Sequence, residues 1–487
     1  MKKYILTSLS VASFLALSSC KTDFDQNVSS IKPTNGDADF SNYVSLGNSL
    51  TSGYRDNALY LDGQKESYPS IIAAQMKLAG GGEFKQPLMP NNTGGFTDVA
   101  GFPGKLNLQV VSGALSPVPS APAAALDNIT SGGPYNNMGV PGAKSYHLLA
   151  DSYGNAEFAK AGKANPYFSR FASSSSTSVI KDAVAKKPTF FSLWIGNNDV
   201  LSYATSGGAG KDQKGNVNPA TYGSNDISDP QVVAGSIEQV VVALKAAGTT
   251  KGILANIPDV STIPFFTTVP AMPITGLTAD QVAALNSAQA YGKYNAGLAT
   301  AKGAGLLSDT EYQQRLIKFT AGATINGAVI VDKDLTNLSA LGLPNYRQST
   351  AKDMIILPAS TLLKSGSGTQ TALEDQYVLT EKEAAKVATA VTAYNAAIAA
   401  IAQKYGLAFV DANAKMKELS SQSGIQYNGV KYTATFVTGG AFSLDGVHLT
   451  GRGYAVIANE FIKAINKTYR STLTQVNPND YSGVKFP

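Results

Sequence analysis

The chain has 487 residues, of which 44% are hydrophobic and 15% are charged. This apolar fraction is enough for a sizeable core, and so little charge excludes a disordered chain. The formal net charge is +5 and no dense stripe of Lys and Arg occurs, so no nucleic-acid partner is expected. The length allows one large domain or a core with big insertions.

Residues 1–19 predict a secretory signal peptide, because two lysines precede a short apolar stretch that ends in Leu17-Ser18-Ser19-Cys20. That ending resembles a bacterial lipobox, in which Cys20 is acylated and becomes the mature N-terminus. The chain has no other cysteine and therefore no internal disulfide. We expect residues 20–41 to be a lipid-anchored tether that holds the protein in the bacterial cell envelope, at the outer membrane. An ordinary cleaved signal with an incidental cysteine is the alternative.

Short strands and helices alternate at the start of the folded part. Residues 43–46 predict a strand and residues 67–78 a helix. Residues 80–134 are rich in Gly, Pro, Asn and Ala, and their pattern assigns no element, whereas a short helix is expected at 144–150. The run TFFSLWI at 189–195 has the continuous apolar character of a strand that is covered on both faces.

A strand–helix–strand unit follows. Asp229 and Pro230 open a helix that ends at Ala247, and residues 252–256 predict another buried strand. This succession is typical of a parallel sheet. Residues 258–377 depart from it and predict a large insertion of mixed structure. The elements predicted there are capping boxes at Thr278 with Gln281 and at Ser308 with Glu311, and strands at 328–331 and 354–357.

The core resumes at Thr380, where a capping box with Glu383 predicts an Ala-rich helix that ends near Tyr405. Residues 408–410 predict the last core strand, and residues 453–465 predict the last helix. The predicted organisation is a domain over 42–470, an insertion within it at about 258–377, and a C-terminal tail at 471–487.

Gly47-Asn48-Ser49-Leu50 directly follows the first predicted strand. A serine on a tight turn after a strand is exposed and lies beside free backbone N–H groups. This placement suits a nucleophile once a base takes the hydroxyl proton. The same residues are also ordinary turn formers, so this motif does not decide the function by itself.

Asp445-Gly446-Val447-His448 lies shortly before the last helix. Histidine is the natural base near neutral pH, and a carboxylate three residues earlier can hold its tautomer, as a catalytic triad requires. A loop stabilised by a local hydrogen bond is the alternative for this motif. The only other histidine, His147, lacks such an aspartate and is interpreted as structural or pocket-lining.

Two further motifs offer hydrogen-bond donors to an oxyanion. Gly196-Asn197-Asn198-Asp199 follows the TFFSLWI strand and presents amide side chains that can donate. Asn137-Met138-Gly139-Val140-Pro141-Gly142 contains glycines, which let a backbone N–H approach a reacting oxygen closely. Taken singly, each motif is typical of a plain loop.

In this order the four motifs resemble the four blocks of the SGNH (GDSL-type) hydrolases, as separated segments across about 43–465. The resemblance implies that Ser49 is the nucleophile and that Asp445 and His448 complete the triad. Asn48 departs from the family motif, which usually has Asp at this place. The change puts the local support of the turn in doubt more than the nucleophile.

The resemblance also implies an oxyanion hole made by Ser49, Gly142 and Asn198. Gly139 lies close enough to Gly142 to leave the choice of glycine open. The implied fold is a three-layer α/β/α core of the SGNH-hydrolase, flavodoxin-like type, with a central parallel sheet and large insertions. This fold agrees with the strand–helix–strand pattern of the core segments.

We expect each motif to lie at the carboxyl end of a strand, where the active sites of open parallel sheets form. The absence of the GxSxG motif argues against the α/β-hydrolase fold. A single cysteine and two separated histidines are a poor set of ligands for a metal ion, so no metal or cofactor is expected. The predicted activity is hydrolysis of a carboxylic ester of a lipid or an acylated glycan. A catalytically silent envelope lipoprotein that binds a glycan or lipid, and an assembly lipoprotein whose insertion binds a protein, are the alternatives.

Overall fold

The computed structural model describes residues 32–487. The predicted signal peptide, the predicted lipidation site Cys20 and part of the tether therefore lie outside the described residues. The first described segment runs against the end of the last helix, where Asp37 N donates to Tyr469 O at 2.7 Å. The chain then enters the first strand at Tyr43.

Five parallel strands form the central sheet. They are β1 (Tyr43–Gly47), β4 (Asn137–Gly139), β5 (Phe190–Trp194), β6 (Lys251–Ala255) and β11 (Ala408–Val410). Their order is β11-β6-β5-β1-β4, and every neighbouring pair runs parallel. The predicted α/β fold with a central parallel sheet is confirmed. The short strand β4 was not expected from the sequence, because NMG is too brief to show a strand pattern.

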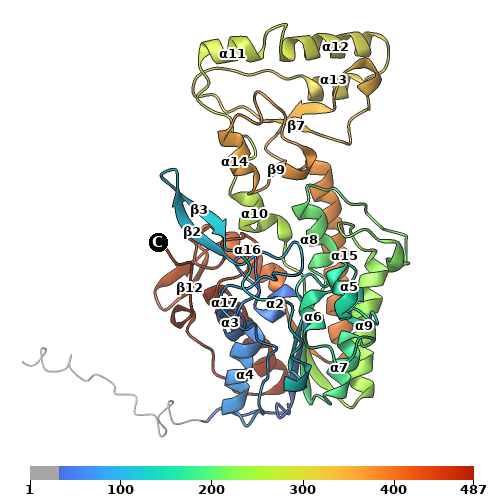
Figure 1. Cartoon of the computed structure of the whole chain (residues 1–487), viewed down its shortest axis with the longest axis vertical. Coiled ribbons are helices and arrows are strands. Elements are labelled where there is room, and N and C mark those ends of the chain that lie inside the picture. Colours follow the sequence, from blue (N-terminus) through green and yellow to red (C-terminus); the bar gives the residue numbers. More distant parts are fainter. Residues whose placement is uncertain (1–31) are drawn as a thin grey trace, which may run out of the picture.

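Helices cover both faces of this sheet. They are α4 (Tyr68–Leu78), α7 (Val179–Ala185), α9 (Pro230–Ala246), α15 (Glu381–Tyr405) and α17 (Gly451–Tyr469). Side chains of each strand alternate between two cores: in β5, Phe191 and Leu193 enter one, and Phe190 and Trp194 enter the other. Helices α7, α9 and α15 close the first core, and α4 and α17 close the second, which gives three layers (Figure 1).

Capping signals place several helices where the sequence predicts them. Reciprocal capping boxes occur at Thr380 and Thr278. Only one of the two hydrogen bonds of the capping box predicted at Ser308 forms: the Ser308 side chain accepts from Glu311 N. The prediction is wrong for the other bond, because the Glu311 carboxylate accepts instead from Thr336 N and Thr336 Oγ1, each at 2.7 Å. A tertiary contact therefore replaces the local hydrogen bond.

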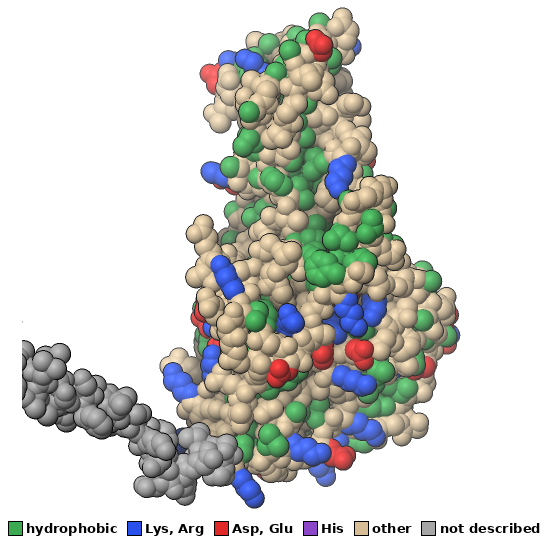
Figure 2. Space-filling view, turned by 90° about the vertical axis from the view of Figure 1, so that its left-hand side faces the viewer, with side chains coloured by type: hydrophobic (Ala, Val, Ile, Leu, Met, Phe, Trp, Pro, Cys, Tyr) green, Lys and Arg blue, Asp and Glu red, His purple; other side chains and the backbone are tan. Residues whose placement is uncertain are grey.

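The region between α10 (Pro264–Thr267) and α15 has a core of its own, formed by apolar residues from Val269 to Val378. It stands above the sheet as a narrower projection (Figures 1 and 2), and hydrophobic side chains gather where it meets the broad core (Figure 2). Its elements are α11 (Ala279–Leu285), α12 (Tyr291–Gly303), α13 (Asp309–Arg315), β7 (Val329–Val331), β8 (Tyr346–Gln348), β9 (Met354–Ile355), α14 (Ala359–Lys364) and β10 (Val378–Leu379). The predicted limits of the insertion stay a prediction.

Between residues 80 and 134, where the sequence assigns no element, one segment is regular. An antiparallel hairpin forms from β2 (Leu106–Val111) and β3 (Ala114–Pro119). Its turn is Ser112-Gly113, with φ of 51° and 79°. Two prolines and the near absence of buried side chains hide its strand pattern in the sequence.

The remaining elements are short, apart from α16. They are α2 (Ser49–Ser52), α3 (Leu61–Lys65), α5 (Ala156–Lys160), α6 (Pro166–Ser169), α8 (Asn198–Thr205), α16 (Ala412–Ser420), β12 (Ile425–Tyr427) and β13 (Val430–Tyr432). Several 3₁₀ turns of three or four residues also occur, and one of them spans Ser145–Leu148 in the segment where a short helix was expected. After α17 the chain continues along the core, where Leu473 and Pro478 are buried.

One helix in the described part of the chain, α15, is long and apolar enough to cross a membrane by its length and composition alone. A core helix passes the same test. Its residues Val387, Val391, Tyr394 and Ile398 belong to the first core, so we interpret α15 as a helix of the α/β/α fold.

Candidate active site

Ser49 lies at the turn that leaves the first strand. It is the first residue of α2 and its side chain is nearly buried, with 6% of the residue exposed. Asn48 caps this helix: its Oδ1 accepts from Leu50 N at 3.1 Å, and its Nδ2 donates to Asn197 Oδ1 at 3.1 Å. The asparagine that departs from the family motif therefore supports the turn with both ends of its amide.

His448 connects Ser49 to Asp445. Its Nε2 lies 2.8 Å from Ser49 Oγ, and its Nδ1 lies 2.9 Å from Asp445 Oδ2. The ring of Tyr54 packs against the imidazole, with 4.7 Å between the ring centroids. The side chains of His448 and Asp445 are 14% and 9% exposed, so little water competes for these hydrogen bonds. This arrangement can transfer a proton from the hydroxyl to the imidazole.

The Asp445 carboxylate accepts five hydrogen bonds. Oδ2 accepts from the His448 ring and from Asn57 N at 2.9 Å. Oδ1 accepts from Val447 N, from His448 N and from Ser443 Oγ at 3.1 Å. Burial alone would raise the pKa of this carboxyl group, but the neighbouring imidazole and these hydrogen bonds hold the pKa of Asp445 well below its usual range. Asp445 is therefore ionised near neutral pH and can stabilise an imidazolium.

Asn198 begins α8, directly after β5. Its Nδ2 donates to Ala143 O at 3.0 Å, which ties this loop to the loop that follows β4. An amide group has two N–H donors, so one remains for a reacting oxygen. Asn198 is 8% exposed, and this second donor is consequently well shielded from bulk water.

Gly139 and Gly142 differ in what their N–H groups do. The N–H of Gly139 donates to Asn137 Oδ1 at 3.0 Å, and a Cβ added there would lie 2.4 Å from Ser52 N. Gly142 is exposed and has a φ of +80°, and within residues 32–487 its N–H donates to no protein group. Gly139 is thus required for close packing, and the geometry favours Gly142 as the available donor.

The loop that carries His448 and its aspartate does not follow a strand of the sheet: α16 and the β12–β13 hairpin come between β11 and this loop. The expectation that every motif lies at the carboxyl end of a strand is therefore wrong here, although Ser49 follows β1 directly. Hydrogen bonds hold the loop instead. Ser443 N donates to His448 O at 2.8 Å, and Phe265 N donates to Gly446 O at 2.9 Å.

Several supporting residues were not singled out from the sequence. Asp199 is fully buried and accepts from Ser145 N at 2.7 Å and from Ser145 Oγ at 2.9 Å, which fixes the segment after Gly142. Asp199 could have been found, because it belongs to the GNND motif. Asn57 could not, since nothing in the sequence pairs it with Asp445, 388 positions later.

Local contacts hold His147. Its Nδ1 accepts from Lys144 N at 3.0 Å, and its ring stacks on Tyr153 with 4.6 Å between centroids. Burial, with the charge of Lys144, lowers the pKa of His147 from 6.5 to about 4. Within residues 32–487 no group of three or more His, Cys, Asp or Glu side chains could hold a metal ion.

The wild type is expected to lose stability as the pH falls from 6.5 to about 4, because His147 stays neutral in the folded state while the unfolded chain takes up a proton. His147→Gln lacks this group. The variant should therefore lose less free energy of unfolding over this window, by up to about 3 kcal/mol. Urea unfolding of both proteins at the two ends of the window measures the difference. Equal pH dependence would contradict the expected shift.

Residues 324–461, less than a third of the chain, match the family model described as GDSL-like Lipase/Acylhydrolase. The resemblance to the GDSL-type hydrolases is confirmed. The GDSL-like match includes Asp445 and His448 and supports hydrolysis of ester bonds in general. No curated protein matches the chain.

Three solved structures are similar to this chain. A putative GDSL-like lipase from Parabacteroides merdae has 11% sequence identity and a TM-score of 0.32, over 89% of this chain and 99% of that chain. An extracellular lipase from Streptomyces rimosus has 13% identity and a TM-score of 0.32, over 87% and 98%. A mutant acetyl-xylooligosaccharide esterase from Geobacillus Stearmophilus has 10% identity and a TM-score of 0.31, over 88% and 96%. Likenesses this distant carry no argument about fold or substrate.

Proposed function

We propose that this chain is a serine esterase or lipase of the GDSL type that hydrolyses carboxylic esters. The observation that carries the proposal is the pair of hydrogen bonds from Ser49 Oγ through His448 to Asp445. His448 takes the Ser49 proton as Oγ attacks the acyl carbon, and Asp445 stabilises the imidazolium. His448 then gives this proton to the departing alcohol. In the second half, water attacks the acyl-enzyme with His448 again as base, and the acid leaves as Ser49 regains its proton.

Three donors would stabilise the oxyanion in both halves of the reaction. They are the N–H groups of Ser49 and Gly142 and the free N–H of the Asn198 amide. The free N–H of Gly142 and the unused donor of Asn198 support this assignment. Such donors act strongly where they are oriented before the charge develops and are shielded from water, and two of the three, Ser49 and Asn198, are buried.

Asn198→Ala is expected to lower kcat by about 10²–10³-fold, since it removes one oxyanion donor. KM should change little, because the donor acts on the transition state more than on the bound ester. Steady-state kinetics with a p-nitrophenyl ester measures both constants. Thermal unfolding serves as the control, since Asn198 also bonds Ala143 O. An unchanged kcat in the folded variant would remove Asn198 from the oxyanion hole.

An apolar pocket lined by residues adjacent in sequence to Ser49 and His448 is the candidate site for the acyl group of the substrate. Its lining includes Leu50, next to Ser49, and Val447 and Leu449, on either side of His448. The pocket holds about 70 Å³ and is lined almost entirely by apolar side chains. Both a lipid ester and an acylated glycan present such a group. A series of p-nitrophenyl esters of increasing chain length separates them, because only a lipid esterase should prefer long chains.

The proposed activity is tested by treating protein that starts at residue 21 with a fluorophosphonate probe. The expected result is one label per molecule, on the peptide that contains Ser49, with loss of ester hydrolysis in proportion to labelling. A folded protein that neither reacts with the probe nor hydrolyses any ester would overturn the proposal. The catalytically silent lipoprotein that binds a glycan or lipid would then take its place.

We further propose that Cys20 is acylated and holds the enzyme in the bacterial cell envelope, at the outer membrane. The lipobox-like Leu17-Ser18-Ser19-Cys20 sequence supports this proposal. Detergent extraction and intact mass of protein expressed in a bacterium test it. Wild type should enter the detergent phase with the added mass of acyl chains. Cys20→Ala should stay in the aqueous phase, and equal behaviour of the two would overturn the anchor.

A further inference from the structure

A hydrogen-bonded network reaches the triad aspartate at Oδ1, the carboxylate oxygen that does not bond the His448 ring. Asp56 is its centre. The N–H of Asp56 donates to Ser443 Oγ at 2.9 Å, and Ser443 Oγ in turn donates to Asp445 Oδ1. Asp56 Oδ1 accepts from Leu444 N at 3.0 Å. Asp56 therefore holds the two residues that precede the triad aspartate, through both its backbone and its side chain.

The backbone at Asp56 has an uncommon shape. Asp56 and Asn57 both have positive φ, 52° and 60°, and neither is glycine. The flanking residues Arg55 and Ala58 exchange both backbone hydrogen bonds, so the chain makes a tight two-residue turn. This turn directs the N–H of Asp56 to Ser443 and the N–H of Asn57 to Asp445. Strained backbone of this kind persists where the surrounding structure fixes it, and it gathers at functional sites.

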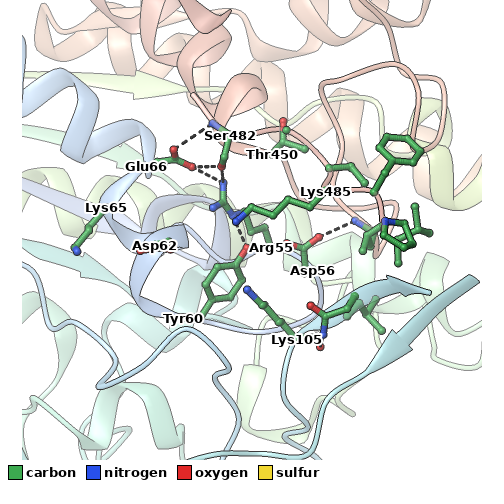
Figure 3. Close-up of a pocket in the computed structure, with 18 residues that line it drawn as sticks. Arg55, Asp56, Tyr60, Asp62, Lys65, Glu66, Lys105, Thr450, Ser482 and Lys485 are labelled. Carbon is green, nitrogen blue, oxygen red and sulfur yellow. Dashed lines mark hydrogen bonds and ion pairs between the residues drawn. The ribbon is translucent and has the colours of Figure 1, made fainter. Parts of the chain in front are cut away.

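A second set of side chains fixes Asp56 from the other side. Tyr60 OH donates to Asp56 Oδ2 at 2.7 Å, and Arg55 Nε donates to Tyr60 OH at 2.6 Å. Arg55 Nη1 then bonds Glu66 Oε2 at 2.7 Å and Ser482 Oγ at 2.9 Å. Arg55, Asp56, Tyr60, Glu66 and Ser482 lie together in the lining of a pocket of about 410 Å³ (Figure 3).

Burial makes this network costly unless it is complete. Arg55 is 5% exposed, and its charge is balanced by Glu66. Burial raises the pKa of Asp56, while the hydrogen bonds from Leu444 N and Tyr60 OH oppose this change. A buried ion pair adds little net stability compared with apolar side chains of similar size, so stability alone gives a weak reason for it. Its contacts point instead to the triad loop.

We infer that Asp56 is a positioning residue for the triad aspartate, and that Tyr60, Arg55 and Glu66 hold Asp56 in place. The inference rests on the proposed function. The loop from Ser443 to His448 carries both the acid and the base, so a small shift at Leu444 moves His448 Nε2 away from Ser49 Oγ. A misplacement of about 1 Å far from the reacting atoms can lower a rate by about 100-fold.

Asp56→Ala is expected to lower kcat per active site by up to about 100-fold, with KM for the same ester unchanged. Asp56→Asn keeps an oxygen for Leu444 N and should retain more activity than the alanine variant. Tyr60→Phe removes only the hydroxyl group and should give a smaller loss in the same direction. Asp62→Asn is the matched control, because Asp62 lines the same pocket, is exposed and belongs to α3. It should behave as wild type.

Titration with the fluorophosphonate probe counts the folded, reactive sites, so that kcat is compared per site. Asp56→Ala and Tyr60→Phe with fewer titrated sites but wild-type kcat per site would overturn the inference, because Asp56 would then only stabilise the fold. If Asp56→Ala does not fold, Tyr60→Phe decides by the same measure. A wild type that neither titrates nor hydrolyses would overturn the proposed function itself, which is a different result from active wild type with unaffected variants.

Discussion

His448→Ala is expected to lower kcat by about 10⁶-fold and to abolish labelling of Ser49 by a fluorophosphonate probe. The reason is that His448 Nε2 lies 2.8 Å from Ser49 Oγ and is the proposed base that takes the hydroxyl proton during attack. Ser49→Ala should cost about as much, and the double variant little more, because nucleophile and base act as one unit. Steady-state hydrolysis of a short p-nitrophenyl ester measures the loss.

His147→Gln is the control for this experiment, since His147 is the only other histidine in the chain. It should keep wild-type kcat at neutral pH. Folding of each variant is checked by thermal unfolding. Labelling or turnover that survives in His448→Ala would remove His448 from the mechanism, and a similar loss in His147→Gln would show that the assay reports folding and not catalysis.

Asp445→Asn is expected to lower kcat by about 10⁴-fold while leaving the fold in place. Asp445 Oδ2 accepts from His448 Nδ1, and this bond keeps the unprotonated Nε2 facing the serine. An amide can present its N–H₂ to Nδ1 and so favour the opposite tautomer. In that orientation the NH₂ group also opposes the N–H of Asn57, which donates to Oδ2 in the wild type, whereas the amide oxygen at the Oδ1 place can still accept from Val447 N and His448 N.

The same substitution should change how the free energy of unfolding depends on pH. The pKa of Asp445 is lowered in the folded protein, so its ionised form stabilises the fold above about pH 4, and this contribution is lost as the pH falls further. Asp445→Asn lacks this contribution and should be less stable than wild type at neutral pH, with a difference that narrows in acid. Urea unfolding at several pH values checks the sign. A constant difference would contradict it.

The sequence predicts the parallel core because the core strands are buried on both faces and are separated by capped helices. TFFSLWI and the segment at 252–256 have the continuous apolar runs that such strands need, and Asp229 and Thr380 mark helix starts by local hydrogen bonding. Local signals fail where tertiary contacts replace them. Glu311 leaves its predicted capping box for Thr336, and the strand β4 forms only because β1 lies beside it.

By itself the sequence determined the types of chemical group that this protein carries and their order along the chain: a serine after a strand, an aspartate three residues before a histidine, and amide and glycine donors between them. These are local properties, set by neighbouring residues. Only the tertiary structure decided that Ser49 and His448, 399 positions apart, lie within hydrogen-bond distance.

The tertiary structure also distinguishes Gly139 from Gly142, because the N–H of Gly139 donates to Asn137 and that of Gly142 is free, which favours Gly142 as the proposed donor. It brought the turn at Asp56 and Asn57 against the triad aspartate, a contact with no trace in local sequence. The physical reason is common to all three: hydrogen bonds between distant segments depend on how the sheet and its helices pack, whereas turns, caps and strands depend on the residues next to them.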